Sequence, residues 1–438
     1  MTDSITLDVR QLRLGLHVHL DLGWMQHPFP LGSFRIATEQ QLQTLRSLGL
    51  ERVKVLLGRS ADDAVEALVQ EGVLAPPPPA APPPAAAPAP ADDQRAREQA
   101  ARRAALEAEK ACALLAERSY AEAGRGLRRC FELAPSQPQA AREQCEAQVR
   151  GFLDKVLGAE EMAIRLLSET AGDRGSLHAV NVTVIALLLA QQLGLDKAAM
   201  FDLGVGSMLH DIGKIELPDR VRWIDPGAVG VSQPERQFYQ EHVARGVVIG
   251  QRMGLAGGAL LVVGQHHELA DGSGFPQRLA AERISLPARI VALVNRYDNL
   301  CNPATPSHAL TPHEALALMY GQMRARFDAA VFGAFVRMMG VYPPGSVVQL
   351  TDERYAIVLS VNASRPLKPR VLVHDIRGRR EDALPLDLES HPELGIRRSL
   401  KPQQLPRATL EFLSPRPRVC YFFERAREPF MSTGEAAL

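Results

Sequence analysis

Near its beginning the chain alternates apolar and polar residues as a half-buried β-strand does. In the segment LHVHLDL, the apolar Leu16, Val18 and Leu20 are separated by two histidines and an aspartate. A period of two places the apolar set on one face of a strand. The intervening His17 and His19 are either solvent-facing strand positions or metal ligands, and the pattern leaves both interpretations open.

A helix and a second strand follow this segment. Thr38 and Gln41 have the spacing of a capping box, and leucines then recur at helical spacing until Gly49. The apolar and basic run RVKVLL begins at Arg52 and predicts another strand. Residues 1–74 are therefore expected to form a small α+β domain, and without a visible catalytic set we expect it to be regulatory.

The sharpest boundary in the chain is residues 75–91, which consist only of proline and alanine, with nine prolines. Such a segment has nothing to bury in a core and favours an extended polyproline-II spacer. We expect it to link two folded parts. A role as ligand of a proline-binding module is the alternative.

The composition of the rest of the chain changes twice, and the predicted secondary structure changes with it. Residues 92–170 are rich in Ala, Glu and Arg and predict two or three amphipathic helices, broken near Pro135 and Pro138, that connect to the next domain. Residues 171–340 predict helices almost throughout, with Ser176 and Asp196 as caps and Gly194 as a stop. The runs SVVQL, YAIVLSV and PRVLVHDI predict a β-rich extension over residues 341–438, with a frayed tail from about residue 425. The expected fold is multi-domain and mainly α.

Charge and cysteine usage narrow the class of protein. The 438 residues include 50 basic and 50 acidic side chains, so no net field favours a nucleic-acid polymer as partner. Five cysteines form no C-x-x-C pair, which argues against a disulfide scaffold and fits a reducing compartment. The start lacks the pattern of a signal peptide, and the longest apolar run, residues 180–190, is interrupted by Asn181 and Thr183. We expect a cytoplasmic protein without a membrane span.

Histidines gather in the helical part of the chain. Seven of the twelve lie between residues 178 and 313. Five of them lie within or at the end of expected helices. They are the single histidines His178 and His242, the adjacent pair His266 and His267, and His210, which directly precedes Asp211. Five imidazoles and a carboxylate are too many ligands for one tetrahedral zinc and suit two cations, with Asp211 as the candidate bridge.

The motifs around these histidines resemble those of a known family. HDIGKIELPD from His210 and HHELADGSGFP from His266 look like the two signatures of the HD-GYP subgroup of HD phosphohydrolases, with Phe275 where tyrosine is usual. Residues 5–74 also resemble the uncharacterised domain that often precedes HD-GYP modules in bacteria. The resemblance implies an all-α catalytic domain with two or three metals, commonly iron or manganese. It also implies hydrolysis of the bacterial second messenger cyclic di-GMP to pGpG or GMP.

The resemblance also assigns roles by position. Metal ligands would be His178, His210, Asp211, His242, His266, His267 and, at the first position of a D-x-x-D pair, Asn295. Lys214 would contact the scissile phosphate and stabilise its developing charge. The signature loop would comprise Asp271, Gly272, Gly274, Phe275 and Pro276. Because Phe275 keeps the ring but lacks the hydroxyl, we expect it to pack rather than to donate a hydrogen bond.

Three departures from the family pattern affect these expectations. The amide of Asn295 is a poorer metal ligand than the carboxylate of the usual aspartate. Asp298 lies one helical turn later, and its carboxylate is the auxiliary ligand that would reach the metal. Arg174 stands where three-metal members have glutamate, so we expect two metals. CNPATPSHAL replaces a basic segment that ordinarily contacts the ligand, and Arg245 and Arg296 are the candidates to compensate.

Three functions remain open from the sequence. The first is a metal-dependent cyclic di-GMP phosphodiesterase acting through a hydroxide bound between two metals. The second is a catalytically weak HD-GYP module that serves as an adaptor, binding cyclic di-GMP or a signalling protein. The third is a phosphohydrolase for another nucleotide or phosphoester. Diguanylate cyclase-type and other signalling proteins, and a second copy of the chain in a homodimer, stay open as partners.

Overall fold

The computed structural model describes residues 4–20, 29, 32–74, 91–158, 162–167, 174–225, 230–362 and 365–425. These residues divide into two compact units, Met1–Gln94 and Arg95–Leu438. The predicted proline and alanine spacer lies outside the described residues except for Ala91, where a helix begins. The predicted frayed tail lies outside them beyond Arg425.

The first unit is the expected α+β domain. Its strands form an antiparallel sheet in the order β1-β4-β2-β3. The elements are β1 (Ser4–Asp8), β2 (His17–His19), β3 (Ser33–Arg35), α1 (Glu39–Ser47), β4 (Arg52–Leu56) and α2 (Asp62–Gln70). Leu16 and Val18 are fully buried, as the alternation predicts, and Thr38 and Gln41 form the predicted capping box. His17 contacts Ser33 across the sheet, with 3.1 Å between Nε2 and Oγ.

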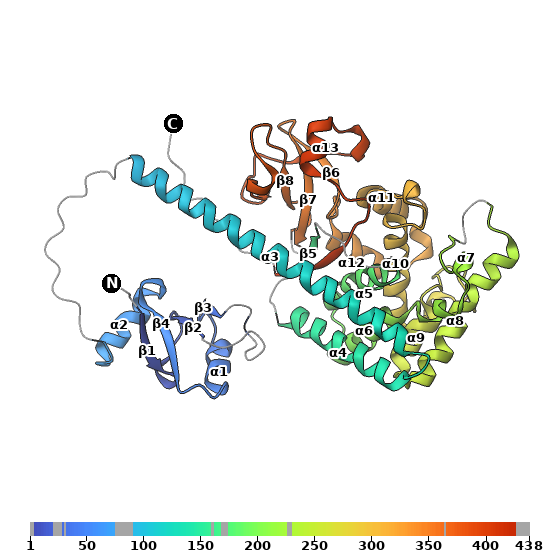
Figure 1. Ribbon diagram of the computed structural model, residues 1–438, viewed down its shortest axis with the longest axis horizontal. Helices are drawn as coiled ribbons and strands as arrows, with labels where there is room; N and C mark the ends of the chain where they lie inside the picture. Colours follow the sequence, from blue (N-terminus) through green and yellow to red (C-terminus); the bar gives the residue numbers. More distant parts are fainter. Residues whose placement is uncertain are drawn as a thin grey trace. The chain divides into compact units, whose positions relative to one another are not determined.

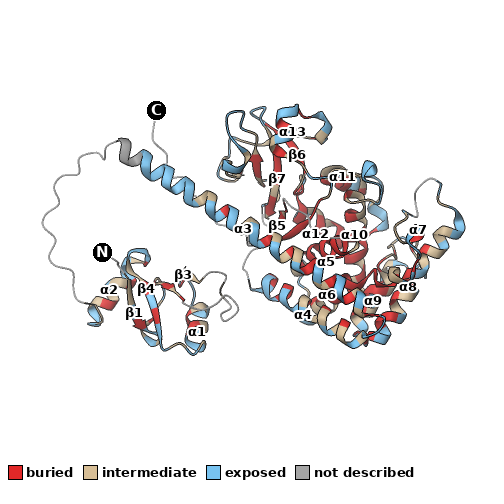
Figure 2. Cartoon of the chain, in the orientation of Figure 1, coloured by how far each residue is buried: buried red, intermediate tan, exposed pale blue. Residues whose placement is uncertain are grey.

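The second unit begins with two helices, α3 (Ala91–Leu133) and α4 (Pro138–Leu157), separated close to the predicted prolines. Figure 1 shows α3 as one long helix, and Figure 2 shows that its first half is exposed whereas its second half contributes buried residues. The prediction of helix up to residue 170 was wrong at Met162–Leu166, which forms strand β5. The short apolar run MAIRL fits a helix or a strand equally by pattern, and pairing with two other strands decides the outcome.

A bundle of helices forms the main core of this unit. It comprises α5 (Arg174–Gln192), α6 (Lys197–Leu209), α7 (Asp219–Arg222), α8 (Gln233–Met253), α9 (Gly257–Gln265), α10 (Leu286–Cys301), α11 (Pro312–Gln322) and α12 (Ala329–Met339). Asp196 caps α6 and Gly194 ends α5 with a positive φ, as predicted. Ser176 is not a cap, because α5 begins two residues earlier and Ser176 is buried in its first turn.

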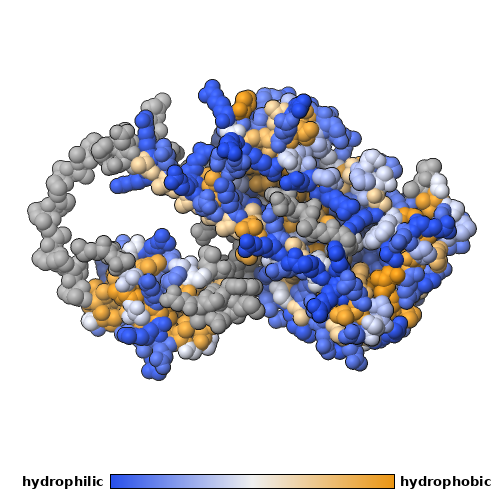
Figure 3. All heavy atoms as spheres, in the orientation of Figure 1, coloured by the Kyte–Doolittle hydropathy of each residue, from blue (hydrophilic) through white to orange (hydrophobic). Residues whose placement is uncertain are grey.

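Helix α5 passes through the middle of this core. Among the described residues it is the one helix long and apolar enough to cross a membrane, and 78% of that apolar window is buried inside the protein. Burial against α6 and α10 on both sides accounts for its apolar surface (Figure 2). Figure 3 shows a mainly hydrophilic surface on the face it displays, with small apolar patches.

The β-rich extension is confirmed, and it does not stand apart from the helices. Strands β6 (Val347–Leu350), β7 (Tyr355–Asn362), β8 (Arg370–Val373), β9 (Leu386–Asp387), β10 (Ile396–Leu400) and β11 (Tyr421–Arg425) join β5 in a seven-stranded sheet, and α13 (Arg407–Leu413) lies among them. The path of the sheet is β10-β6-β7-β5-β11, with β8 on β7 and β9 on β8. Tyr421, Phe422 and Phe423 of β11 belong to the main helical core.

A buried ion-pair network ties the long helix to this sheet. Arg165 of β5 lies 2.6 Å from Glu109 of α3 and 2.8 Å from Glu424 of β11. Arg370 of β8 contacts the same two carboxylates at 2.8 and 3.3 Å. Each carboxylate is therefore shared by two guanidinium groups, so the network fixes α3 against the sheet.

Candidate metal centre

The His210-Asp211 pair lies at a junction between two helical segments. α6 ends at Leu209, and a 3-10 turn (Ile212–Glu216) follows. Gly213 in this turn packs against α8 so closely that an added Cβ would lie 2.0 Å from the backbone oxygen of His242. Only glycine permits this approach, which brings α8 and its histidine to the junction.

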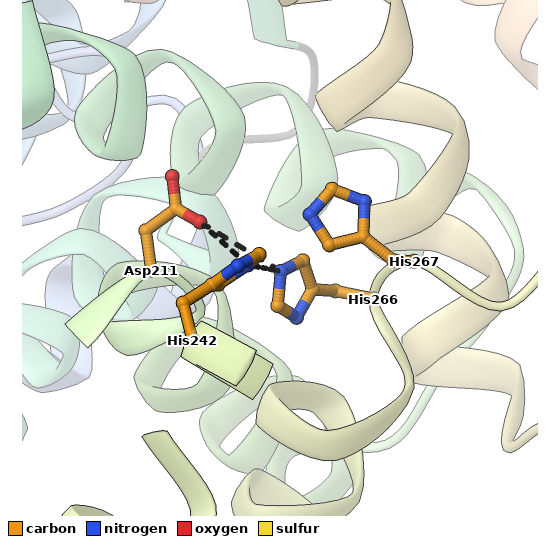
Figure 4. A group of neighbouring side chains, drawn as sticks. All are labelled: Asp211, His242, His266 and His267. Atoms are coloured by element: carbon orange, nitrogen blue, oxygen red, sulfur yellow. Dashed lines mark hydrogen bonds and ion pairs between the residues drawn. The ribbon is translucent and has the colours of Figure 1, made fainter. Parts of the chain in front are cut away.

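Asp211 contacts one group of histidines through Oδ1. The distances from Oδ1 are 3.5 Å to Nε2 of His242 on α8 and 3.7 Å to Nε2 of His266 at the end of α9. His267 completes the group, whose ligand atoms all lie within 4.8 Å of one another. Figure 4 shows Asp211 and His242 on one side and the two adjacent histidines approaching from the other.

A second group forms around the other oxygen of the same carboxylate. Oδ2 of Asp211 lies 3.5 Å from Nε2 of His210 and 3.8 Å from Nε2 of His178 on α5. These three ligand atoms also lie within 4.8 Å of one another. The structure thus places two adjacent three- or four-ligand groups on either side of Asp211, and brings together six of the seven ligands named from the sequence.

Hydrogen bonds to the backbone set the tautomer of three imidazoles. Nδ1 of each lies close to the carbonyl oxygen of the residue three positions earlier: His210 to Ser207 at 2.7 Å, His242 to Tyr239 at 2.5 Å and His266 to Val263 at 2.8 Å. A carbonyl only accepts, so Nδ1 carries the proton and Nε2 keeps its lone pair. The lone pairs then point toward Asp211, as metal ligation requires.

His178 is oriented by a carboxylate instead. Its Nδ1 lies 2.6 Å from Oδ2 of Asp298 on α10. Oδ1 of Asp298 accepts hydrogen bonds from Asn181 at 2.8 Å and Asn302 at 2.9 Å. The structure therefore places Asp298 next to His178, where its carboxylate orients the imidazole ring. The predicted role of Asp298 as an auxiliary metal oxygen stays a prediction.

Asn295 is buried one turn before Asp298, but its amide contacts lie elsewhere. Its Oδ1 accepts a hydrogen bond from Nδ2 of Asn299 at 2.6 Å, one turn later on α10. The structure therefore gives Asn295 a partner on its own helix. Its predicted role as a metal ligand stays a prediction.

Burial and charge keep three of the imidazoles neutral and the carboxylate ionised. Burial, with Lys214 nearby, lowers the pKa of His242 to about 3. Burial also holds the pKa values of His210 and His267 well below the usual 6.5. For Asp211, burial alone would raise the pKa, but Lys214 and His210 outweigh it and hold that pKa well below 3.8. Neutral imidazole and ionised carboxylate are the forms that bind metal.

Lys214 lies against Asp211 and is enclosed by aromatic rings. Its Nζ is 2.7 Å from Oδ2 of Asp211, 5.2 Å from the ring centre of Tyr239 and 5.6 Å from that of Trp223. Burial would lower the pKa of Lys214, but Asp211 outweighs it and raises that pKa. The ammonium is therefore charged and stands next to the shared carboxylate.

The signature loop packs on the group of His242, His266 and His267 through its phenylalanine. The Phe275 ring stacks on His267, with 4.4 Å between ring centres and 20° between planes, which is the packing role expected for it. Gly274 lies so close to the backbone that an added Cβ would be 2.5 Å from the carbonyl oxygen of His267. The buried Glu268 closes the loop, because its carboxylate accepts hydrogen bonds from the amides of Gln277 and Leu279. Asp271 accepts two hydrogen bonds from Ser273 at the loop's exposed tip, where Gly272 has a positive φ.

Two buried polar atoms in the centre are left without a hydrogen-bond partner. They are Oδ1 of Asp211 and Nε2 of His267, and both belong to the group drawn in Figure 4. Buried polar atoms in native proteins are almost always satisfied, and a carboxylate oxygen and an imidazole lone pair both suit a divalent cation. The donor set fits a metal centre.

Comparison with known proteins gives the family. The protein-family model described as HD domain matches residues 161–331, and the family model described as Domain of unknown function (DUF3391) matches residues 4–145. A cyclic di-GMP phosphodiesterase of Pseudomonas aeruginosa is 30% identical over 84% of this chain and 84% of its own length. The chain belongs to the HD-GYP family of HD phosphohydrolases. It is a metal-dependent phosphodiesterase, as the motifs of the sequence indicated.

Two further relatives match shorter parts of the chain. The cyclic di-GMP phosphodiesterase response regulator RpfG of Xanthomonas campestris pv. campestris is 35% identical over 35% of this chain and 40% of its own length. The 3'3'-cGAMP-specific phosphodiesterase 1 of Vibrio cholerae serotype O1 is 28% identical over 46% of this chain and 48% of its own length. The HD-GYP relatives therefore include proteins named for two different cyclic dinucleotides.

Sequence reasoning missed several residues around the HD-GYP centre. Tyr120, Asn181 and Trp223 contact its ligands or their partners. None belongs to a motif, and they come from three separate segments, so only the fold reveals them. Arg245, expected to compensate for missing basic residues, pairs with Glu241 and Glu216 at 2.7 and 3.4 Å.

Proposed function

We propose that the protein hydrolyses cyclic di-GMP to pGpG or GMP at the Asp211 centre, as a cytoplasmic enzyme of bacterial second-messenger signalling. His178, His210 and Asp211 would hold one divalent ion, and Asp211, His242, His266 and His267 the second, with iron or manganese the expected metals. Divalent ions bound there supply Lewis acidity toward a phosphodiester and lower the pKa of water. The name of the Pseudomonas aeruginosa relative supports this substrate.

One observation carries the proposal: a single carboxylate has one oxygen toward each of two histidine groups. Adjacent cation positions a few Å apart suit in-line displacement at phosphorus, where both the attacking and the leaving oxygen carry negative charge. A metal site that only stabilises the fold would need neither a carboxylate shared by two histidine groups nor a buried carboxylate oxygen without a hydrogen-bond partner.

The chain's own residues have distinct tasks in this proposal. Asp298 and the backbone carbonyls orient the imidazoles. Lys214, held by Asp211, stabilises the charge that develops on the scissile phosphate. Phe275 packs on His267 and keeps that ring in place. Residues 1–74 act as the regulatory domain, joined through the spacer at 75–91 and the connector at 92–170 to the catalytic domain at 171–340.

The test is turnover of cyclic di-GMP by protein purified without oxygen and reconstituted in turn with Fe(II) and Mn(II). Products are resolved by chromatography and metal is counted by elemental analysis. Formation of pGpG or GMP supports the proposal. About two metals per chain without product over hours would favour a binding module instead.

A second substrate has a specific observation behind it, because one relative is named for 3'3'-cGAMP. Both cyclic dinucleotides contain two phosphodiesters and differ in a base, so the metal groups do not distinguish them. Parallel assays with cyclic di-GMP and 3'3'-cGAMP compare kcat/KM. A higher kcat/KM for 3'3'-cGAMP would reassign the substrate and leave the reaction class intact.

A further inference from the structure

The long helix α3 reaches the metal centre through one buried side chain. The hydroxyl of Tyr120 lies 3.0 Å from the carbonyl oxygen of Leu177 and 3.0 Å from Oδ1 of Asn181, both on α5. Tyr120 is 1% exposed, and its ring meets that of Phe422 on β11 edge to face, with 6.2 Å between ring centres. The hydroxyl has a single proton, so the two oxygens share it. Because Leu177 directly precedes His178, α3 contacts the helix that carries a predicted metal ligand at the ligand itself.

Asn181 connects Tyr120 to the carboxylate beside His178. Oδ1 of Asn181 accepts hydrogen bonds from the Tyr120 hydroxyl at 3.0 Å and from the backbone amide of Tyr421 at 3.1 Å. Nδ2 of Asn181 donates to Oδ1 of Asp298 at 2.8 Å, and Oδ2 of the same carboxylate lies 2.6 Å from Nδ1 of His178. The acceptor end of the amide thus faces α3 and β11, and its donor end faces Asp298. The hydroxyl on α3 therefore helps to fix the amide that holds the carboxylate in place.

A second anchor holds α3 three turns earlier. Glu109 is the first buried residue in the described part of this helix. It pairs with Arg165 and Arg370 of the sheet at 2.6 and 2.8 Å. Tyr120 follows Glu109 by eleven positions, which is about three helical turns or about 16 Å and brings both side chains to the same face of α3. A displacement of the helix at Glu109 therefore moves the Tyr120 hydroxyl.

The part of α3 before these anchors lies on the surface. Residues 95–104 are exposed, and Figure 2 shows this half of the helix mainly in pale blue. The helix begins at Ala91, the last residue of the proline and alanine spacer. The covalent path from residues 1–74 to the HD-GYP centre therefore runs through α3.

Only one of the two ligand groups depends on this helix. The His178 group comprises His178, His210 and Asp211, and the His242 group comprises Asp211, His242, His266 and His267. The rings of His210, His242 and His266 are held by carbonyl oxygens three residues earlier in their own segments. The ring of His178 is held from another helix, by a carboxylate that Asn181 contacts. A change at Tyr120 should therefore act on the His178 group alone.

We propose that α3 controls the metal affinity of the His178 group, with Tyr120 as the positioning residue through which it acts. The inference rests on the proposed function, because it takes the Asp211 centre as the site of hydrolysis. While Tyr120 fixes the amide of Asn181, the imidazole of His178 stays oriented with Nε2 toward Asp211. A shift of α3 removes this support, and the His178 group then binds metal less tightly. The connector helix is thereby the element through which the regulatory domain acts on the centre.

The first experiment titrates metal-free, full-length protein with Mn(II) and follows binding by electron paramagnetic resonance, which distinguishes single ions from coupled pairs. In Tyr120→Phe, the Kd of the His178 group should rise roughly 3- to 10-fold, below the roughly 10- to 100-fold typical of a direct partner of a ligand. The Kd of the His242 group should match wild type. Tyr297→Phe is the matched control, because Tyr297 is a fully buried phenol whose hydroxyl pairs with that of Tyr421 at 3.1 Å. It should leave both Kd values unchanged.

A second pair of variants tests α3 itself. Glu109→Gln loosens the anchor at the sheet, and its control is Glu107→Gln, whose side chain is 70% exposed on the same helix. Glu109→Gln should weaken Mn(II) binding by the His178 group, but it should add nothing to the effect of Tyr120→Phe, because both changes act through one hydroxyl. Glu107→Gln should have no effect in either background.

The outcomes that overturn the inference are distinct. Unchanged affinity of the His178 group in Tyr120→Phe does so, as do equal losses at both ligand groups or losses that Tyr297→Phe reproduces, because these indicate general destabilisation. No effect of Glu109→Gln, or a loss that simply adds to that of Tyr120→Phe, overturns control by α3. Thermal unfolding of the metal-free variants identifies folding defects, and Tyr120→Phe and Tyr297→Phe should unfold at similar temperatures. Metal affinity is measured without substrate, so absent turnover of cyclic di-GMP would count against the proposed function and leave this comparison intact.

Discussion

Nδ1 of His178 lies 2.6 Å from Oδ2 of Asp298, a residue buried on α10 one turn after Asn295. The contact gives His178 the same support that backbone carbonyls give His210, His242 and His266. It also gives a reason for the aspartate at the second position of the D-x-x-D pair, Asp298, although the first position of that pair is Asn295 in this chain. The carboxylate acts on the ring of His178, a predicted metal ligand.

Replacing Asp298 by asparagine should therefore weaken one metal position selectively. Loss of an orienting carboxylate typically costs roughly 10- to 100-fold in metal affinity. Metal affinity should fall at the His178 group and stay near the wild-type value at the His242 group. Titration with Mn(II) should therefore show one weakened site of two. Asp154→Asn, on the exposed surface of α4, is the control. Equal weakening of both sites would contradict this account.

Asn181 should matter for stability as well as for the centre. Its side chain is buried and makes four hydrogen bonds, with Tyr120, Asp298, Val419 and the amide of Tyr421. Asn181→Ala removes the partner of the buried amide of Tyr421 and one hydrogen bond each from Tyr120, Asp298 and Val419, so it should lower the free energy of unfolding by about 2–4 kcal/mol. Tyr120→Phe removes only one hydroxyl and should cost about 1 kcal/mol. Chemical denaturation of metal-free protein measures both, and equal costs would refute the network.

Metal should stabilise the fold through the same residues. A ligand at about 100 times its Kd adds about 2.7 kcal/mol to stability if it binds only the folded state. Adding Mn(II) to protein stripped by a chelator should raise the unfolding midpoint, and His266→Ala should reduce that rise. His308→Ala, at an exposed position, should leave it intact. A rise of the same size in His266→Ala would remove this residue from the ligands.

The ion-pair network between α3 and the sheet predicts a pH dependence. Burial would raise the pKa of Glu109, but Arg165 and Arg370 outweigh it and lower that pKa from 4.5 to about 2. A carboxyl with a depressed pKa in the folded state stabilises the fold above the unfolded pKa and loses this contribution as pH falls toward the folded pKa. The contribution at neutral pH is on the order of 3 kcal/mol.

Denaturation of wild type and Glu109→Gln tests this dependence. The comparison uses metal-free protein, so that protonation of histidine ligands does not enter. The stability difference between the two should be constant between pH 7 and 5 and shrink below about pH 4.5. A difference that stays the same down to pH 3 would show that Glu109 has no depressed pKa.

Much of the fold and most of the centre were predictable from local patterns. Alternation predicted the strand around Val18, capping predicted the helix after Thr38, and adjacency in sequence brought His210 to Asp211. These features depend on residues close together in the chain. The family motifs then supplied the distant histidines.

What the sequence left out depends on long-range packing. β5 was taken for helix because a five-residue apolar run has no distinctive period, and its partners β7 and β11 lie far along the chain. The contact of Asp298 with His178 was not predictable, because helical spacing alone does not show what the carboxylate faces. Val419 belongs to no motif, and only its backbone hydrogen bonds to Asn302 and Asn181 join the segment before β11 to the residues around the centre.

The central claim is that Asp211 joins two metal positions into one catalytic centre. The most direct test measures metal content and cyclic di-GMP turnover of wild type and Asp211→Ala side by side, after reconstitution with Fe(II) or Mn(II). We predict about two metals and product formation for wild type, with turnover abolished and metal lost in the variant. Unchanged turnover in Asp211→Ala would contradict the claim.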